Sequence, residues 1–224
     1  MGDLNNIKNR IKGLSLTLLC DECLNNIEYC IRNAVENNID GDFIETGVWK
    51  GGAVIYAYHI LKELHSNKKV YCADSFEGLP MPDVGKYPTD NGDSHWSLTY
   101  LKVDLETVKN NFKMFGEIGD NVIFLKGWFK DTLPNCNIEK LSVLRLDGDM
   151  YESTWEALEA LYPKLSIGGF CIIDDFGLRR CHAAVLDYRN KFDITEEYIS
   201  VMDNKEYILG TRKDVPPVYW VKRK

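Results

Sequence analysis

Hydrophobic positions in this chain follow two spacings, one typical of helices and the other of buried strands. Leu24, Ile27, Ile31 and Val35 recur at helical spacing, whereas residues 42–46 form a short segment typical of a strand. The same patterns predict further helices over residues 53–64, 105–115, 155–165 and 181–192, and further strands over residues 70–74, 122–125, 141–146, 170–173, 197–202 and 218–221. This alternation predicts a doubly wound α/β fold with a mostly parallel seven-stranded sheet, helices on both faces and an antiparallel edge.

Two local sequence signals predict where one helix begins and where a long loop lies. Ser153 and Glu156 match a capping box, which predicts that the helix of residues 155–165 begins there. Residues 76–103, approximately, are rich in proline and glycine, and a loop of that length inside a compact domain is often functional. Because 224 residues is the size of one domain, we expect a single domain over residues 1–224. Within it, we expect residues 1–23 to be an N-terminal extension and partial lid, and residues 76–103 to cover the substrate.

Composition narrows the class of protein. Hydrophobic residues make up 45% of the chain, as in an ordinary globular protein, and the net charge of −7 argues against nucleic acid or an anionic membrane as a partner. The apolar stretch at Leu14–Leu19 is too short for a membrane helix and runs into Asp21, so we expect a cytoplasmic protein with no membrane partner. Seven cysteines, an odd number, indicate reduced thiols rather than a disulfide framework.

Most of the chemically suggestive residues follow the predicted strands. In a parallel α/β sheet, ligands bind beyond the carboxyl ends of the strands. Residues 45–52 follow the first strand and contain three glycines that let the backbone turn sharply near a ligand, although a tight strand-to-helix turn would look the same. Asp74 ends the second strand, where nucleoside-binding sheets place an acid that accepts hydrogen bonds from ribose hydroxyls. Together, the two features favour an adenosine-type cofactor.

Four aspartates form a more specific pattern. Asp147 and Asp149 follow one buried strand, and Asp174 and Asp175 end another. Carboxylates that converge on one rim repel each other unless a cation or shared protons relieve them, and ligation by oxygen alone suits Mg²⁺ or another hard divalent ion. One or two of these residues could instead cap helices. The pattern nevertheless predicts a metal site.

The sequence resembles the macrocin O-methyltransferase family in several motifs, which follow one another in the family's order over roughly residues 13–202. The motifs are GDFIETGVWKGGA at residues 41–53, DSFEGLP at 74–80, GWFKDTLP at 127–134, LRLDGDMYEST at 144–154, LYPKL at 161–165 and GGFCIIDD at 168–175. The resemblance implies a Rossmann-like class I methyltransferase fold. It also implies S-adenosylmethionine as methyl donor, a divalent metal, and sugar hydroxyls as acceptors.

The resemblance further implies a role for each matching residue. Asp147, Asp174 and Asp175 would hold the metal, and Asp149 would be the general base. The cofactor-binding residues would be Glu45, Gly47 and Val48 at the methionine end, Asp74 at the ribose, Ser75, Gly127 and Trp128 at the adenine end, and, elsewhere along the cofactor, Trp49, Gly51, Phe76, Phe129 and Asp147.

The sequence therefore predicts a Mg²⁺- and S-adenosylmethionine-dependent O-methyltransferase that acts on a sugar hydroxyl of a glycosylated natural product or glycan. Alternatives are methylation of a catechol-like vicinal diol, a metal-dependent hydrolase on the same fold, and a regulatory domain that binds the cofactor without turnover. The intact Asp149 argues against the last, because pure binding needs no base. The family resemblance makes a homodimer plausible.

Some features depart from the family's pattern or remain outside it. Residues 17–18 read Thr-Leu where the family carries Thr-Met, and Cys23 stands where it carries arginine. The segment of residues 203–217 is longer than the family's usual link between its last strands. His95 lies in the long loop and His182 opens the last predicted helix; either could contact the acceptor, although an ordinary surface position for His95 is an equal alternative.

Overall fold

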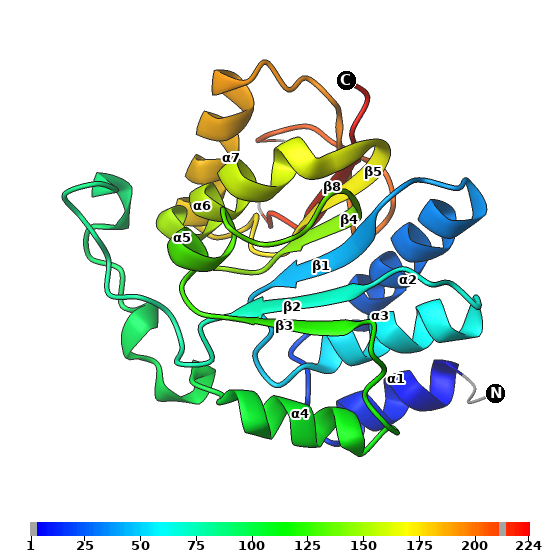
Figure 1. Ribbon diagram of the computed structural model, residues 1–224. Coiled ribbons are helices and arrows are strands. Elements are labelled where there is room, and N and C mark those ends of the chain that lie inside the picture. Colours follow the sequence, from blue (N-terminus) through cyan, green and yellow to red (C-terminus); the bar gives the residue numbers. More distant parts are fainter. Residues whose placement is uncertain (1–3, 211–213) are drawn as a thin grey trace.

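The computed structural model describes residues 4–210 and 214–224, and within them an eight-stranded sheet forms the centre of the molecule (Figure 1). The strand order is β3-β2-β1-β4-β5-β8-β6-β7, in which β1 to β5 run parallel and the last three strands pair antiparallel. The strands are β1 (Asp42–Thr46), β2 (Val70–Asp74), β3 (Val122–Lys126), β4 (Leu141–Leu146), β5 (Leu165–Ile173), β6 (Tyr198–Ser200), β7 (Glu206–Tyr207) and β8 (Val218–Val221). The predicted fold class is thus confirmed.

Helices cover both faces of this sheet. Helices α1 to α4 share one apolar core on one side of the sheet, and α5 to α7 share another on the other side (Figure 1). Their bounds are α1 Leu4–Gly13, α2 Asp21–Glu36, α3 Gly52–Glu63, α4 Leu105–Lys113, α5 Phe129–Thr132, α6 Tyr151–Leu161 and α7 Arg179–Lys191, with 3-10 turns at Pro88–Asp90, His95–Ser97, Thr99–Leu101 and Tyr162–Lys164. No helix among the described residues is long and apolar enough to cross a bilayer.

Two details of the prediction were wrong. Helix α6 begins at Tyr151 rather than at a capping box, and its N-cap, Met150, makes no side-chain hydrogen bond to the helix. Instead, the carboxylate of Asp90 in the long loop accepts hydrogen bonds from the first two amides of α6, at 2.9 and 2.8 Å. The sheet also has one strand more than predicted, because β7 pairs with β6 over only two residues and is too short to leave a sequence pattern.

The N-terminal helix belongs to the core. Leu4, Ile7 and Ile11 of α1 are buried, and α1 packs against α3 (Figure 1). Residues 14–20 then lead across the sheet's carboxyl edge into α2. The described part of the expected N-terminal extension therefore contains a helix that supports α3 before the chain reaches the edge where ligands bind.

The topology defines where that edge is most open. Strands β1, β2 and β3 succeed each other in one direction, whereas β4 and β5 lie on the other side of β1. The order in which successive strands are added to the sheet therefore reverses between β1 and β4. Ligands bind α/β sheets at such a switch point.

Candidate active site

A cavity of about 760 Å³ lies along the carboxyl ends of the parallel strands. The register brings these ends level: Thr46 pairs with Ala73 on one side and with Leu146 on the other, and Leu146 pairs with Ile173. The residues that follow these four positions therefore form one row. They are Gly47, Asp74, Asp147 and Asp174.

Most predicted site residues line this cavity. They are Glu45, Gly47, Val48, Trp49, Asp74, Ser75, Gly127, Trp128, Phe129, Asp147, Asp149, Asp174 and Asp175. At Gly47, φ is +92° and a Cβ atom would lie 1.7 Å from the Asp147 carbonyl oxygen, so only glycine fits between the two strand ends. The sequence thus brings both candidate binding segments to one cavity.

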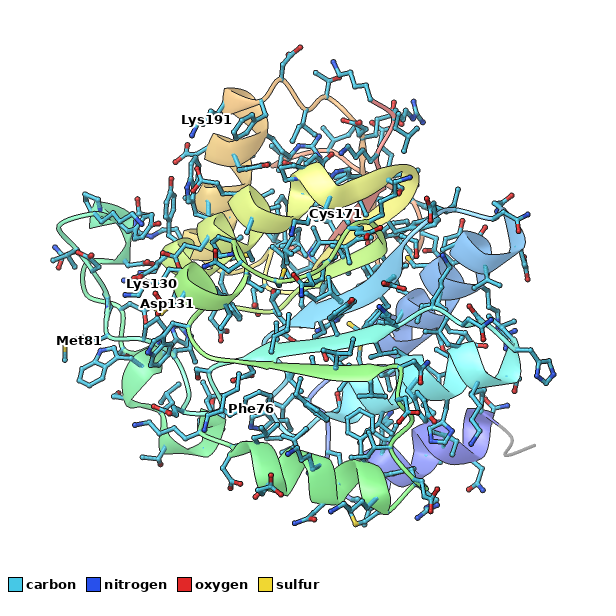
Figure 2. All side chains as sticks on the ribbon, in the orientation of Figure 1. Phe76, Met81, Lys130, Asp131, Cys171 and Lys191 are labelled. Carbon is cyan, nitrogen blue, oxygen red and sulfur yellow. The ribbon has the colours of Figure 1, made fainter. Side chains whose placement is uncertain are left out.

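Two predicted cofactor residues and one histidine lie elsewhere. Gly51 is the N-cap of α3, and a Cβ atom there would meet a side chain of α4. Phe76 is buried between the sheet and α4, where it packs edge-on against Phe124 (Figure 2). His182 stacks on Phe176 at a centroid distance of 4.5 Å and does not line the cavity.

Asp74 joins the turn after β1 to the turn after β2. Its Oδ2 accepts hydrogen bonds from the amides of Val48 (2.7 Å) and Trp49 (3.3 Å). Its Oδ1 accepts from the amide of Phe76 (2.7 Å) and the hydroxyl of Ser75 (3.4 Å). Because these bonds already use about four lone pairs of a carboxylate, a ribose hydroxyl would have to replace the two longest of them.

The acidic residues converge as the sequence predicts. One carboxylate oxygen each of Asp147, Asp174 and Asp175 lie within 4.8 Å of one another. Three oxygens at this spacing, borne by side chains that are only partly exposed, fit a hard divalent ion such as Mg²⁺. Burial raises the pKa of Asp174 to about 6 and that of Asp175 well above its ordinary value, and the neighbouring carboxylates raise both further. A cation bound here would relieve this burial and repulsion.

A buried arginine supplies part of the missing positive charge. Arg145 of β4 is only 1% exposed, and its guanidinium contacts Glu45, Asp147 (2.9 Å) and Asp174 (2.6 Å). Burial raises the pKa of Glu45 to about 8, with Arg145 acting in the opposite direction. The Glu45 Oε2 atom has no hydrogen-bond partner among the described residues, although Glu45 lines the cavity. An unpaired buried acceptor at this position suits a positively charged ligand group.

Asp149 has an unusual backbone conformation. Its φ of +58° is in the left-handed region, which costs a non-glycine residue free energy and often marks a functional site. Its amide donates to Asp175 Oδ2 at 2.9 Å, so the carboxylate cluster holds this conformation. Burial, and after it the charge of Asp147, raises the pKa of Asp149 to about 6. A carboxylate with such a pKa can accept a proton near neutral pH.

Residues 16–19 form one wall of the cavity, between α1 and α2. Gly52 fixes their position, because its amide donates to the Leu16 carbonyl (3.0 Å) and a Cβ atom there would lie 2.5 Å from that oxygen. Behind this wall, Cys20 caps α2 by accepting from the amide of Cys23 at 3.3 Å. Cys23, where the resemblance leads one to expect arginine, is buried and packs in the core on the α1–α4 side.

Parts of the long loop of residues 76–103 form another wall of the cavity. The indole N–H of Trp49 donates to the Tyr100 carbonyl (2.9 Å), which fastens the end of the loop to the turn after β1. Asp90 fastens its middle to α6, as described above. Met81 lines the cavity, is 69% exposed and projects at the outer edge of the molecule (Figure 2). The rim on this side is therefore partly apolar.

Some cavity residues were absent from the prediction. Lys130 and Glu152 line the cavity from α5 and α6, and nothing in their spacing distinguishes them from solvated helix residues. Glu156 also lines the cavity, although its spacing from Ser153 was interpreted only as a capping box. Arg145, which acts through its ion pairs, did have a signal: a single cation inside the apolar run of β4 must find acidic partners if the strand is buried.

Comparison with known proteins bears on what this cavity binds. The sequence model of the family described as "Macrocin-O-methyltransferase (TylF)" matches residues 8–207. The chain is similar to demethyldecarbamoylnovobiocin O-methyltransferase of Streptomyces niveus, with 44% identity over 202 residues that cover 88% of this chain and 76% of that protein. It is also similar to mycinamicin III 3''-O-methyltransferase of Micromonospora griseorubida, with 41% identity over 189 residues that cover 83% and 74% of the two chains.

Solved structures agree with these matches. The O-methyltransferase NovP superimposes with a TM-score of 0.83 and 42% sequence identity, over 93% of this chain and 82% of that one. The calicheamicin methyltransferase CalS11 superimposes with a TM-score of 0.65 over 97% of this chain and 91% of its own, and at 17% identity it shows similarity of fold alone.

Proposed function

This chain belongs to the macrocin O-methyltransferase family, and on that premise we propose that it transfers a methyl group from S-adenosylmethionine to a sugar hydroxyl of a glycosylated natural product or glycan, with Mg²⁺ bound. The observation that carries the proposal is the convergence of Asp149 and three further carboxylates on one cavity at the switch point of the sheet. An adenosine-type ligand alone would not need this cluster.

The cofactor would lie along the ends of β1 and β2. Glu45, with its unpaired Oε2, suits the ammonium group of the methionine part. Asp74 suits the ribose hydroxyls, which would exchange with the long hydrogen bonds from Trp49 and Ser75. Trp128 and Phe129 line the cavity beyond β3 and suit the adenine ring.

The acceptor hydroxyl would lie beside the acidic cluster. Asp147, Asp174 and Asp175 would hold Mg²⁺, which when bound stabilises negative charge on an acceptor oxygen. Asp149 would take the hydroxyl proton on its carboxylate, for which its raised pKa is suited. The walls formed by residues 16–19 and 76–103, proposed here as covers, would exclude water and orient the acceptor.

The names of the relatives favour a sugar acceptor. The mycinamicin enzyme is named for a 3''-hydroxyl, and a third relative, 44% identical over 176 residues, for the 4'-position of a rhamnosyl group. No feature of the cavity specifically favours a catechol-like diol. The hydrolase alternative is disfavoured because the chain belongs to a family of O-methyltransferases. A hydrolase with two metal ions would also need two groups of ligands, and the described residues contain one group of three carboxylates with metal-site geometry.

Calorimetric titration of S-adenosylhomocysteine, with and without Mg²⁺, tests the cofactor assignment before any acceptor is known. We expect saturable binding at micromolar or lower concentration. Transfer of labelled methyl groups from S-adenosylmethionine to a panel of 4-nitrophenyl glycosides then tests the reaction, and activity that survives EDTA would remove the metal from the proposal. Self-association into a homodimer remains a prediction, which sedimentation velocity checks.

A further inference from the structure

A histidine of the covering loop faces the cavity with one ring nitrogen unused. His95 lines the cavity and its side chain is 31% exposed. Its Nδ1 lies 2.9 Å from Asp93 Oδ2, while its backbone amide donates to Asp93 Oδ1 at 2.8 Å. Nε2 has no hydrogen-bond partner among the described residues. Because an ionised carboxylate only accepts hydrogen bonds, Asp93 keeps the proton on Nδ1 and leaves Nε2 for a ligand.

The carboxylate that orients this ring is itself firmly held. The side chain of Asp93 is completely buried, and Arg180 at the start of α7 lies 3.4 Å from it. Arg180 also donates to the Asn91 carbonyl at 2.9 Å, and neighbouring Asp90 binds the first amides of α6. A buried charge with such partners is a costly arrangement for a loop whose only function is to connect two elements.

These anchors also determine which part of the cavity His95 faces. Helix α6 begins just after Asp149, and α7 begins just after Asp175, so the loop is fixed to the two segments that carry the acidic cluster. His95 is close enough to Asp149 for a positive charge on the ring to lower the pKa of that carboxyl. His95 thus lines the cavity near the proposed acceptor region and reaches it from the loop, not from a strand end.

We infer that His95 binds the acceptor: its Nε2 forms a hydrogen bond with a sugar hydroxyl other than the one that reacts, and Asp93 is the positioning residue that orients it. This inference rests on the proposed function and deepens it, because it supplies a means of selecting among hydroxyls. The acidic cluster can activate any hydroxyl presented to Asp149, whereas a second contact from the loop admits one orientation of the sugar.

The test compares His95→Phe with His95→Gln, using the 4-nitrophenyl glycoside that the wild-type enzyme methylates best. The phenyl ring keeps the shape and loses the hydrogen bond, so we expect the acceptor KM to rise about three- to tenfold. The binding constant for S-adenosylhomocysteine should not change. Glutamine can place an amide group near the position of Nε2, so it should recover part of the loss. Ser94→Ala, an exposed neighbour in the same loop, is the control and should behave as wild type.

Deoxy analogues of the glycoside identify the partner hydroxyl. Removing that hydroxyl should raise KM for the wild type and leave no further effect for His95→Phe, whereas removing any other should act equally on both enzymes. Long-range ¹H–¹⁵N spectra should show His95 protonated on Nδ1, with Asp93→Asn disturbing this signature.

Two kinds of result would overturn the inference. An active wild type together with an unchanged acceptor KM in His95→Phe, or a loss of kcat alone, contradicts acceptor binding by His95 and leaves the proposed function intact. Absence of transfer by the wild type to every glycoside, although S-adenosylhomocysteine binds, overturns the proposed function and this inference with it.

Discussion

The two sides of the cavity hold their side chains in different ways. On the sheet side, the carboxylates at the ends of β1, β4 and β5 are fixed by strand register and by the buried Arg145. On the covering side, residues 16–19 are irregular, and residues 76–103 contain only turns and short 3-10 helices. Some of their apolar side chains, such as Leu18 (71%) and Met81 (69%), are largely exposed.

We propose that this difference separates the groups that perform the chemistry from those that select the acceptor. A catalytic group must be held to within a fraction of an ångström, and strand ends provide that precision. Loops tolerate sequence change, so they can alter which acceptor is admitted without disturbing the reacting groups. We therefore expect substitutions on the sheet side to affect kcat or stability, and substitutions on the covering side to affect the acceptor KM.

Asp149→Asn should have the largest effect, since it removes the proposed base. A general base contributes about a hundred- to ten-thousand-fold to rate, so kcat should fall within that range. Affinity for S-adenosylhomocysteine should remain close to wild type, because the proposed cofactor contacts follow β1, β2 and β3 and do not include the Asp149 side chain. Single-turnover methyl transfer and calorimetry measure the two quantities. An unchanged kcat would contradict the assignment of Asp149 as the general base.

Arg145→Met should destabilise the fold by about 3–5 kcal/mol, because it leaves the contacting carboxylates buried without their cation. Urea unfolding monitored by circular dichroism measures this change. Mg²⁺ should restore part of the stability if the ion binds to the same carboxylates. Lys140→Met is the matched control: Lys140 pairs with Asp40 on the surface, and its loss should cost less than about 1 kcal/mol. Equal effects of the two substitutions would contradict the role given to Arg145.

Asp174→Asn tests the metal site by removing one of three oxygen ligands. The Mg²⁺ concentration needed for half-maximal activity should rise by at least about tenfold, since even outer-shell partners of a metal contribute that much. Asp131→Asn, an exposed aspartate on α5, is the control and should leave the requirement unchanged. Activity of Asp174→Asn that shows the wild-type Mg²⁺ dependence would place the ion elsewhere.

The fold could be predicted because its strands are buried. Short apolar runs such as residues 141–146 and 170–173, separated by a helical segment, are typical of buried parallel strands. Strand β7 and helix α5 could not be predicted, because two and four residues leave no periodic signal and tertiary contacts hold them. Leu4, Ile7 and Ile11 do have helical spacing, so the sequence does carry a signal for α1, which the interpretation of residues 1–23 as an extension left unused.

The sheet side and the covering side of the candidate site also differ in how well they could be predicted from the sequence. The sheet side could be predicted, because residues that follow parallel strands must meet at one edge. The covering side could not, because its contacts join residues far apart in sequence: Asp90 and Tyr151 are separated by 61 positions, and Trp49 and Tyr100 by 51. The capping box at Ser153 was misassigned for this reason, since the group that caps α6 comes from the long loop.

Trp49→Phe should have the smallest effect, and it tests whether the covering side moves independently of the sheet side. The substitution removes the indole N–H that holds the Tyr100 carbonyl, a neutral hydrogen bond that contributes about 1 kcal/mol. Opening of the loop should therefore become about fivefold more frequent, and amide hydrogen exchange near residues 98–102 should accelerate by that factor. The acceptor KM should rise by a similar factor while kcat at saturation stays constant.

Trp96→Phe is the matched control. It makes the same change in the loop of residues 76–103, but the Trp96 indole forms no hydrogen bond among the described residues, so amide exchange should stay at the wild-type rate. A fall in kcat for Trp49→Phe without faster exchange would mean that the turn after β1 acts on the reacting groups directly, and the separation of chemistry from selection would not hold at that turn.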